Sequence, residues 1–443
     1  MERREVVEVR VRRFIVHNFG CRAAQADGAA IESMLETRGL EPVRRAAAAD
    51  LVILNTCTVT DSADDDVRHS IRRVHRENPE ARILVTGCYA QRAPEELRAL
   101  PGVAWVVGNS HKTRIPEILD ESAGAPYHGQ VHVSDIFAEQ QFLSAPINDA
   151  VADRTRRNLK IQDGCSNRCS FCIIPAVRGR SRSAPAGHVV EQVRTLAARY
   201  REVVLSGINL GRWGRENGGR LRLVHLLRRL LDETPIERLR ISSVEPMDFS
   251  GELLELMASS PRIARHVHAP LQSGSDAVLK RMRRKYRTRH YEDRIRRAHA
   301  LMPDAAFGAD VMTGFPGETD AEFEESCRFI ESLPFTYLHV FTYSERPGTE
   351  AAARPDQVPV ALRRERTRTL RDLSARKNLD FRRRMLGRTL TAVTLNSGAV
   401  ALTDNYLNVE LATPREPNRL IEVTIGGVTE TAVAESAALA VLG

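Results

Sequence analysis

The sequence predicts an α/β protein of three parts: an N-terminal doubly wound parallel-sheet domain, a central partial (β/α)6 barrel and a small C-terminal β-barrel. Two long stretches alternate short β-branched runs with helical sequence, which is typical of parallel sheets covered by helices. The last stretch holds short runs in which apolar and polar residues alternate, as in small β-barrels. The length of 443 residues also corresponds to about three domains.

The N-terminal domain is predicted over residues 11–123. Four β-branched runs each precede a helical stretch there, and three of these runs are followed by a cysteine: Cys21, Cys57 and Cys88. Parallel strands bring their C-terminal ends to one edge of the sheet, which is where doubly wound domains bind ligands. We therefore expect the three thiols to converge, although they are far apart in the sequence.

A linker is predicted at 124–150 and the central barrel at 151–383. The linker residues lack sustained periodicity and contain Gly and Pro. From Leu159 the strand–helix rhythm resumes in six units, fewer than the eight of a complete (β/α) barrel. Chemistry in such barrels takes place at the C-terminal ends of the strands, where these six segments become polar or glycine-rich.

The C-terminal β domain is predicted over 384–443, from runs such as LTAVTLN and LIEVTI. From residue 385 onward it carries three Arg against six Asp or Glu, so it is acidic within a chain of net charge +8. The preceding segment, 362–384, holds ten Arg or Lys against three Asp or Glu. We therefore expect this basic segment either to attract an anionic partner or to form a solvated helical face.

Composition excludes a membrane-spanning or disordered chain. Hydrophobic residues make up 42% and charged residues 28%, as in globular proteins, and no apolar run approaches the roughly 18 residues of a membrane span. The N-terminal MERREVVEVRVRR lacks the apolar core of a secretory signal, so we expect a cytoplasmic protein without a membrane partner. Cytoplasmic thiols stay reduced, so the seven cysteines indicate metal ligation or catalysis rather than disulfides.

Cys165, Cys169 and Cys172 form a C-x3-C-x2-C pattern directly after the first strand of the central barrel. Thiolates at this spacing can hold a cubane iron–sulfur cluster and leave one iron without a protein ligand. Zinc also accepts thiolates, but structural zinc usually takes four protein ligands, and no fourth Cys or His stands beside these three. The pattern therefore favours an iron–sulfur cluster with one open iron.

This loop, with Phe171 just before its last cysteine, resembles the radical S-adenosylmethionine (radical SAM) superfamily. The resemblance implies that the open iron binds the amino and carboxylate groups of SAM, whose one-electron cleavage gives a 5′-deoxyadenosyl radical. The segments NTCTVT, TGCYAQ and CIIPAVRGRSRS are similar to the methylthiotransferases, and most of all to the branch acting on N6-threonylcarbamoyladenosine of tRNA. This similarity implies methylthiolation at C2 of the adenosine just 3′ of the anticodon, and a TRAM-like C-terminal domain.

The resemblance also implies the cofactors: two [4Fe-4S] clusters and SAM. Cys165, Cys169 and Cys172 would hold the first cluster, and Cys21, Cys57 and Cys88 a second that carries or donates the sulfur. We assign no side chain a catalytic role. Strand ends facing SAM should offer glycine for close backbone approach and polar groups for the amino acid and ribose. The candidates for these SAM contacts are Gly207, Asn209, Ser243, Glu245, Gln272, Ser273 and Asp310.

The expected partners are tRNA, a one-electron reductase and a sulfur donor. Basic residues cluster at 178–182 and 280–289, where Arg and Lys are expected to contact phosphates without reading bases. Other functions stay open on the sequence alone. The same radical chemistry can act on isopentenyladenosine in tRNA or on a ribosomal protein side chain. A zinc-stapled RNA-binding protein without catalysis is a further alternative.

Overall fold

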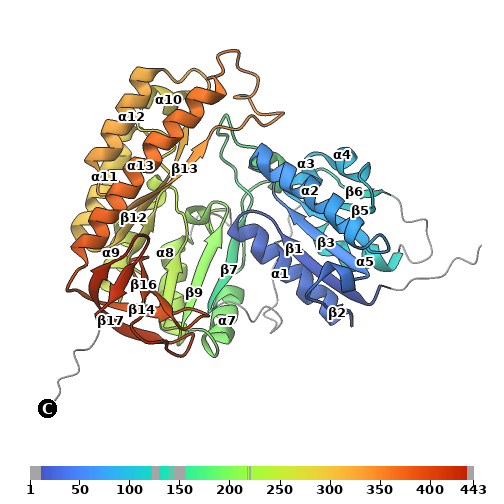
Figure 1. Ribbon diagram of the computed structural model, residues 1–443, viewed down its shortest axis with the longest axis horizontal. Helices are drawn as coiled ribbons and strands as arrows, with labels where there is room; N and C mark the ends of the chain where they lie inside the picture. Colours follow the sequence, from blue (N-terminus) through green and yellow to red (C-terminus); the bar gives the residue numbers. More distant parts are fainter. Residues whose placement is uncertain are drawn as a thin grey trace, which may run out of the picture. The chain divides into compact units, whose positions relative to one another are not determined.

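The computed structural model of the protein describes residues 11–121, 129–138, 142–143, 155–216, 218 and 221–436 (Figure 1). The chain forms two compact units. The first comprises Met1–Val151 with Asp163–Asn167 and Cys172–Arg182, and the second comprises Ala152–Gln162, Arg168–Phe171 and Ser183–Gly443. Among the described residues, no helix combines the length and the apolar content that crossing a bilayer requires.

The first unit is built on a six-stranded parallel sheet in the order β2–β1–β3–β4–β5–β6. The sheet order reverses direction between β1 and β3, which makes this pair the switch point of a doubly wound domain. The strands are β1 (Arg13–Asn18), β2 (Glu41–Pro42), β3 (Leu51–Thr56), β4 (Arg82–Gly87), β5 (Val103–Gly108) and β6 (Gln130–His132).

Helices cover both faces of this sheet, as the doubly wound prediction requires. Helices α1 and α5 pack on one face, and α2, α3 and α4 pack on the other. All six residues of β3 are buried because alternate side chains enter the two opposite cores. The helices are α1 (Arg22–Thr37), α2 (Asp61–Glu77), α3 (Cys88–Arg92), α4 (Pro94–Arg98) and α5 (Ile115–Glu121).

Part of the predicted linker belongs to this sheet. The sequence places residues 124–150 between domains, whereas β6 pairs in parallel with β5 inside that range. The backbone N–H of Ser134, just beyond β6, donates to Ser110 Oγ at 3.0 Å. Short strands at a sheet edge give little periodicity, which is why the sequence pattern did not reveal β6. Most of the remaining linker lies outside the described residues.

The six predicted parallel strands and the two-residue β8 lie in two sheets of order β10–β9–β7–β8 and β11–β12–β13. The Val244 N–H, just beyond β10, donates to His268 O of β11 at 3.0 Å, so the sheets continue into each other there. The strands are β7 (Arg156–Asp163), β8 (Arg182–Ser183), β9 (Glu202–Gly207), β10 (Arg238–Ile241), β11 (His266–His268), β12 (Ala306–Thr313) and β13 (Tyr337–Thr342).

Helices follow these strands along the chain, which confirms the partial (β/α)6 barrel (Figure 1). The long last helix packs against β12 and β13. The helices are α6 (Ile174–Arg178), α7 (Ala186–Ala197), α8 (Leu223–Glu233), α9 (Gly251–Ser259), α10 (Asp276–Arg281), α11 (Thr288–Leu301), α12 (Asp320–Ser332) and α13 (Val360–Arg384).

The C-terminal strands close a barrel in the order β14–β15–β16–β18–β17, as predicted. The strands are β14 (Thr389–Thr394), β15 (Val400–Thr403), β16 (Asn408–Glu410), β17 (Leu420–Val428) and β18 (Val433–Glu435). This small barrel packs at the N-terminal ends of the central strands. Arg240 of β10 donates to the backbone oxygens of Thr403 and Asp404 at 2.9 and 3.0 Å, and it forms a fully buried ion pair with Glu202 at 2.9 Å.

Candidate cluster and cofactor sites

Cys21, Cys57 and Cys88 lie at the C-terminal ends of β1, β3 and β4, at the switch point of the first sheet. Cys21 is exposed at the start of α1, whereas Cys57 and Cys88 are buried. Gly20 has φ +93°, and a Cβ on it would lie only 2.9 Å from Cys57 Sγ. The loop before Cys21 therefore reaches Cys57 only because residue 20 has no side chain. This contact brings the loops after β1 and β3 together, as predicted.

The surroundings of these thiols favour a positive ligand. Burial raises the pKa of the Cys57 thiol to about 12, and the neighbouring Cys88 and Cys21 thiols raise it further as they ionise. Clustered thiols of this kind stay protonated unless a metal compensates their charge, because a coordinated thiol loses its proton. Asn109 Nδ2 donates to Cys88 Sγ at 3.7 Å, a contact that suits a thiolate. The trio therefore fits a thiolate-held cluster.

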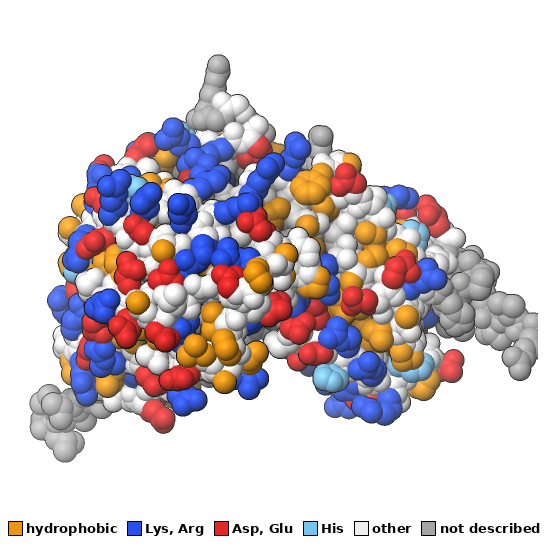
Figure 2. Space-filling view, turned by 90° about the horizontal axis from the view of Figure 1, so that it is seen from above, with side chains coloured by type: hydrophobic (Ala, Val, Ile, Leu, Met, Phe, Trp, Pro, Cys, Tyr) orange, Lys and Arg blue, Asp and Glu red, His pale blue; other side chains and the backbone are white. Residues whose placement is uncertain are grey.

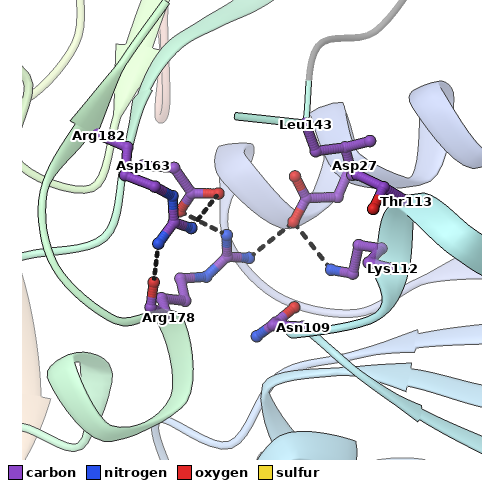
Figure 3. A pocket seen from close by; sticks show the side chains of 8 residues that line it. All are labelled: Asp27, Asn109, Lys112, Thr113, Leu143, Asp163, Arg178 and Arg182. Atoms are coloured by element: carbon purple, nitrogen blue, oxygen red, sulfur yellow. Dashed lines mark hydrogen bonds and ion pairs between the residues drawn. The ribbon is translucent and has the colours of Figure 1, made fainter. Parts of the chain in front are cut away.

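A buried charge network lies in the same unit (Figure 3). Arg178 is only 2% exposed, and its two Nη atoms contact Asp27 Oδ2 at 3.0 Å and Asp163 Oδ1 at 2.9 Å. Lys112 Nζ donates to the same oxygen of Asp27 at 3.0 Å. Arg182, Asn109, Thr113 and Leu143 complete the lining of a small pocket.

Arg178 connects this network electrostatically to the cysteines. Burial would lower its pKa, but the Cys88 thiol and the carboxyls of Asp163 and Asp27 outweigh burial and raise that pKa. A permanent positive charge near the thiols favours their ionised form. The sequence did not reveal this network, because Asp27, Lys112 and Asp163 lie far apart in the sequence and on different elements.

The cysteine loop 165–172 begins at the end of β7. Gly164 has φ +65°, and a Cβ there would lie 2.0 Å from Arg180 O, so only glycine fits this turn. The Cys165 N–H donates to Gly179 O at 3.0 Å, and the Asn167 N–H donates to Cys165 Sγ at 3.4 Å. None of the seven cysteines, all within the described residues, forms a disulfide.

The middle of the loop is anchored inside the second unit. Ser170 donates its N–H to Met282 O at 3.1 Å and its hydroxyl to Arg281 O at 2.8 Å. Phe171 packs edge-on against Phe315. These contacts fix the Ser170 backbone and the Phe171 ring next to Cys169, whose Sγ accepts a hydrogen bond from Arg284.

Arg284 is a partner of Cys169 that the sequence did not reveal. Its Nη1 donates to Cys169 Sγ at 3.2 Å, and its Nη2 contacts Glu245 Oε2 at 2.5 Å. The guanidinium lies 5.0 Å from the centroid of the Tyr286 ring, whose hydroxyl donates to Pro270 O at 2.7 Å. Hydrogen bonds to cluster sulfurs are a recurring feature of iron–sulfur sites. Three cysteines in one loop with a charged N–H donor fit a cluster.

Six of the seven residues predicted to bind SAM lie at strand ends or in the loops that follow. Gly207 is the last residue of β9, and the Asn209 N–H donates to Gln162 Oε1 at 2.6 Å. Glu245 lies beyond β10, where burial raises its pKa against the opposing effect of Arg284. Gln272, beyond β11, has φ +67° and bridges to Val311 of β12.

Ser243 and Ser273 also lie in loops after strands, but each contacts a neighbouring side chain, and Asp310 lies within a strand. Ser273 is buried, and its hydroxyl lies 3.0 Å from Ser326 Oγ and accepts from the Ser275 N–H, so it organises its own loop. Ser243 Oγ lies 2.6 Å from His268 Nδ1. Asp310 is in the middle of β12 rather than at its end, between His268 and His339.

The basic segments are less exposed than the sequence suggested. Arg178 is buried, and three arginines of α13 are buried as well: Arg363, Arg366 and Arg382. Arg366 pairs with Glu318 at 2.8 Å, and Arg382 donates to Thr429 O at 2.6 Å. Exposed basic side chains remain on the second unit, including Lys280, Arg283, Lys285, Arg287 and Arg289. Figure 2 shows many Lys and Arg side chains on this unit, interspersed with acidic ones.

Two family models match the chain. Residues 13–108 match the uncharacterized protein family UPF0004, and residues 159–330 match the radical SAM superfamily. The chain is 36% identical to the threonylcarbamoyladenosine tRNA methylthiotransferase MtaB of Aquifex aeolicus, over 92% of this chain and 98% of the relative. It is 38% identical to the MtaB of Bacillus subtilis, over 89% of each chain. The chain belongs to the radical SAM methylthiotransferase family.

Other comparisons agree with this membership. The tRNA-2-methylthio-N(6)-dimethylallyladenosine synthase of Thermobifida fusca is 34% identical, over 85% of this chain and 76% of the relative. Among solved structures, the radical SAM methyltransferase TsrM of Kitasatospora setae matches with a TM-score of 0.57 at 16% identity, over 77% of each chain, which shows a shared fold. As a member of the methylthiotransferase family, the protein is a SAM-dependent enzyme that uses SAM and [4Fe-4S] clusters.

Proposed function

We propose that the protein is a tRNA methylthiotransferase that attaches a methylthio group to C2 of N6-threonylcarbamoyladenosine, next to the anticodon. The observation that carries this proposal is the pair of cysteine trios: one at the switch point of the first sheet, the other in the loop after β7. Four relatives named threonylcarbamoyladenosine tRNA methylthiotransferase support the substrate, at 33 to 38% identity over 84 to 93% of this chain.

In this proposal each trio holds one [4Fe-4S] cluster. Cys165, Cys169 and Cys172 hold the cluster that binds SAM, and Cys21, Cys57 and Cys88 hold the auxiliary cluster. When bound, the two clusters and SAM supply a 5′-deoxyadenosyl radical and the sulfur. SAM is contacted by the strand ends at Gly207, Asn209, Glu245 and Gln272, whose polar groups suit its amino acid and ribose.

The protein's own contribution is to orient and to balance charge. Arg284 fixes the rotamer of Cys169 through its N–H and is itself held by Glu245. Gly20 allows two cysteine loops to approach each other. Arg178 lowers the cost of placing thiolates in a buried site, because its charge opposes theirs.

The tRNA is held by exposed basic side chains around Tyr286, namely Lys280, Arg283, Lys285, Arg287 and Arg289. Arg and Lys neutralise phosphates without reading bases, so the affinity for tRNA should fall steeply as salt rises. A one-electron reductase and a sulfur donor act with the enzyme, because SAM cleavage needs an electron and the product contains a new sulfur. A tRNA substrate and reduced cysteines suit the cytoplasm.

The proposal is tested by mass spectrometry of tRNA nucleosides from a strain that lacks the protein. We expect the 2-methylthio form of N6-threonylcarbamoyladenosine to disappear and to return on expression of the wild type. Expression of the Cys57→Ala variant should not restore it. A 2-methylthio signal that persists in the deletion strain would contradict the proposed substrate.

A second candidate substrate is isopentenyladenosine in tRNA. Relatives named tRNA-2-methylthio-N(6)-dimethylallyladenosine synthase share 32 to 36% identity with this chain. The same nucleoside digest separates the two candidates, because each modified adenosine has its own mass. Loss of the isopentenyl product alone would assign the protein to this second branch.

A further inference from the structure

Two histidines and an aspartate, none of them part of either cysteine trio, gather inside the second unit. His268 ends β11, Asp310 lies in the middle of β12, and His339 lies on β13. Asp310 is directly opposite His339 in the register of β12 and β13, and His268 is opposite Gly308, two residues before Asp310. Because residues two apart share a face of a strand, the three side chains project from the same face of the sheet.

We propose that His268, Asp310 and His339 bind a divalent first-row transition metal. One nitrogen of each histidine and one oxygen of Asp310 all lie within 4.8 Å of one another. Asp310 Oδ1 is 3.4 Å from His268 Nε2 and 3.2 Å from His339 Nδ1. Donor atoms 3.2 and 3.4 Å apart can share an ion at about 2.1 Å from each, the usual length of such metal–ligand bonds. Two imidazoles and one carboxylate suit Zn²⁺, Fe²⁺ or Co²⁺.

Neighbouring residues already orient the first histidine as a ligand. Ser243 Oγ lies 2.6 Å from His268 Nδ1, so the opposite nitrogen of the ring, Nε2, is the one that faces Asp310. Metal-binding histidines nearly always use their second nitrogen for a hydrogen bond of this kind. The Tyr337 ring stacks on His268 with centroids 5.8 Å apart, and it fits there because Gly308 has no side chain. The orientation of His268 is therefore fixed from two sides.

The site is closed on one side and open on the other. The side chain of His268 is 5% exposed, that of Asp310 is 22% exposed and that of His339 is 50% exposed. Three protein ligands leave at least one coordination position vacant, which is typical of metal sites that bind a further ligand. The vacant positions would take water, or an oxygen or nitrogen donor of a molecule bound inside the barrel. This metal site uses none of the six cluster cysteines and does not depend on the proposed tRNA substrate.

The competing interpretation is a set of hydrogen bonds without a metal, in which both imidazoles donate to Asp310. Zinc binding to the anaerobic holoenzyme, with both clusters intact, distinguishes the two. The enzyme is dialysed against micromolar ZnCl2, and zinc and iron are then measured on the same sample. We expect the wild type to bind one more zinc per chain than either variant, Asp310→Asn or His339→Ala. The affinity of each variant for this zinc should be at least tenfold weaker than that of the wild type. Equal zinc binding by the wild type and both variants would overturn the proposal.

Two further measurements keep the test independent of folding and of the cysteines. His69→Ala removes an exposed histidine of α2 and should bind zinc like the wild type, whereas Ser243→Ala should weaken binding about tenfold or more through His268. Zinc X-ray absorption of the wild type should show nitrogen and oxygen neighbours at about 2.0–2.1 Å. Sulfur neighbours at about 2.3 Å would place the zinc on cysteines and refute the site.

Discussion

The two cysteine trios are brought together in different ways, one by the local chain and one by the fold of a whole domain. Cys165, Cys169 and Cys172 lie within eight residues of one loop, so their proximity is set by the local chain. Cys21, Cys57 and Cys88 are 36 and 31 residues apart in the sequence. They come together only because the parallel sheet places the C-terminal ends of β1, β3 and β4 at one edge. The first trio is therefore recognised from spacing alone. The second depends on the register and packing of a whole domain.

The largest expected effect comes from removing one ligand of each trio. Cys169→Ala should abolish SAM cleavage and leave the auxiliary cluster, whereas Cys57→Ala should abolish methylthiolation and leave SAM cleavage. Iron should fall from about eight to about four atoms per chain in each variant, as measured anaerobically. Cys327→Ala, on α12 outside both trios, is the control and should retain both activities. SAM cleavage that persists in Cys169→Ala would reverse the assigned roles.

A glycine substitution tests whether the second trio depends on close packing of loops. In Gly20→Ala the new methyl group would lie 2.6 Å from Cys57 Cβ, at a backbone φ of +93°. We expect loss of the auxiliary cluster and of methylthiolation, with SAM cleavage retained. Gly39→Ala has a similar φ of +83° but no atom within 4 Å of the added methyl, so it measures backbone strain alone. Equal cluster loss in both variants would show that strain, not the contact with Cys57, is responsible.

The buried ion pair between Glu202 and Arg240 is expected to stabilise the second unit. Glu202→Gln leaves Arg240 buried without a counter-charge, and we expect a loss of about 3–5 kcal/mol in the free energy of unfolding. Burial alone would raise the pKa of Glu202, but Arg240, together with Arg156 and Arg238, outweighs burial and holds that pKa below its ordinary value. A carboxyl with a lowered pKa stabilises the fold above its unfolded pKa of about 4.3 and loses this contribution as pH falls further.

Thermal unfolding of the second unit between pH 7 and pH 3 gives the readout. Below about pH 4 the wild type should lose stability more steeply than Glu202→Gln, which has no carboxyl to protonate at this position. Parallel pH curves for the two proteins would mean that Glu202 is not the group responsible.

The smallest expected effect concerns the reduction potential of the cluster on Cys165, Cys169 and Cys172. Arg284→Lys removes the guanidinium N–H that donates to Cys169 Sγ. Fewer donors to a cluster sulfur make reduction harder, so the potential of this cluster should fall by an amount of the order of 59 mV, a tenfold change for one electron. Potentiometric EPR measures this shift. Arg283→Lys, whose side chain pairs at the surface with Glu350, should leave the potential unchanged.

The sequence predicted the strands, and the cysteines at their ends, better than it predicted the residues that contact those cysteines. The strands before Cys21, Cys57 and Cys88 were visible because buried parallel strands form continuous β-branched runs. The basic run 178–182 predicts a phosphate contact, but Arg178 is buried between Asp27 and Asp163. Long-range pairings of this kind leave no local pattern, because each partner lies on a different element.

The same limit explains what was missed inside the barrel. Arg284 stands among basic residues at 280–289, and nothing in the sequence separates it from its exposed neighbours. Asp310 was predicted at a strand end, but it lies in mid-strand, and His268 and His339 became its neighbours only through the register of β11, β12 and β13. The residues that tune a site are therefore harder to predict than those that form it.

The contacts of the C-terminal barrel with the central domain limit where the chain can be cut into separate fragments. Arg240 depends on two backbone oxygens of that barrel, and Asn418 Nδ2 donates to Arg199 O in the turn just after α7. A fragment cut after residue 383 would expose the hydrophobic floor formed by Ala306 and Tyr337 and remove two backbone acceptors of the Arg240 guanidinium. The acidic barrel is thus not a detachable RNA-binding module, and a catalytic fragment lacking it should be recovered only as aggregate.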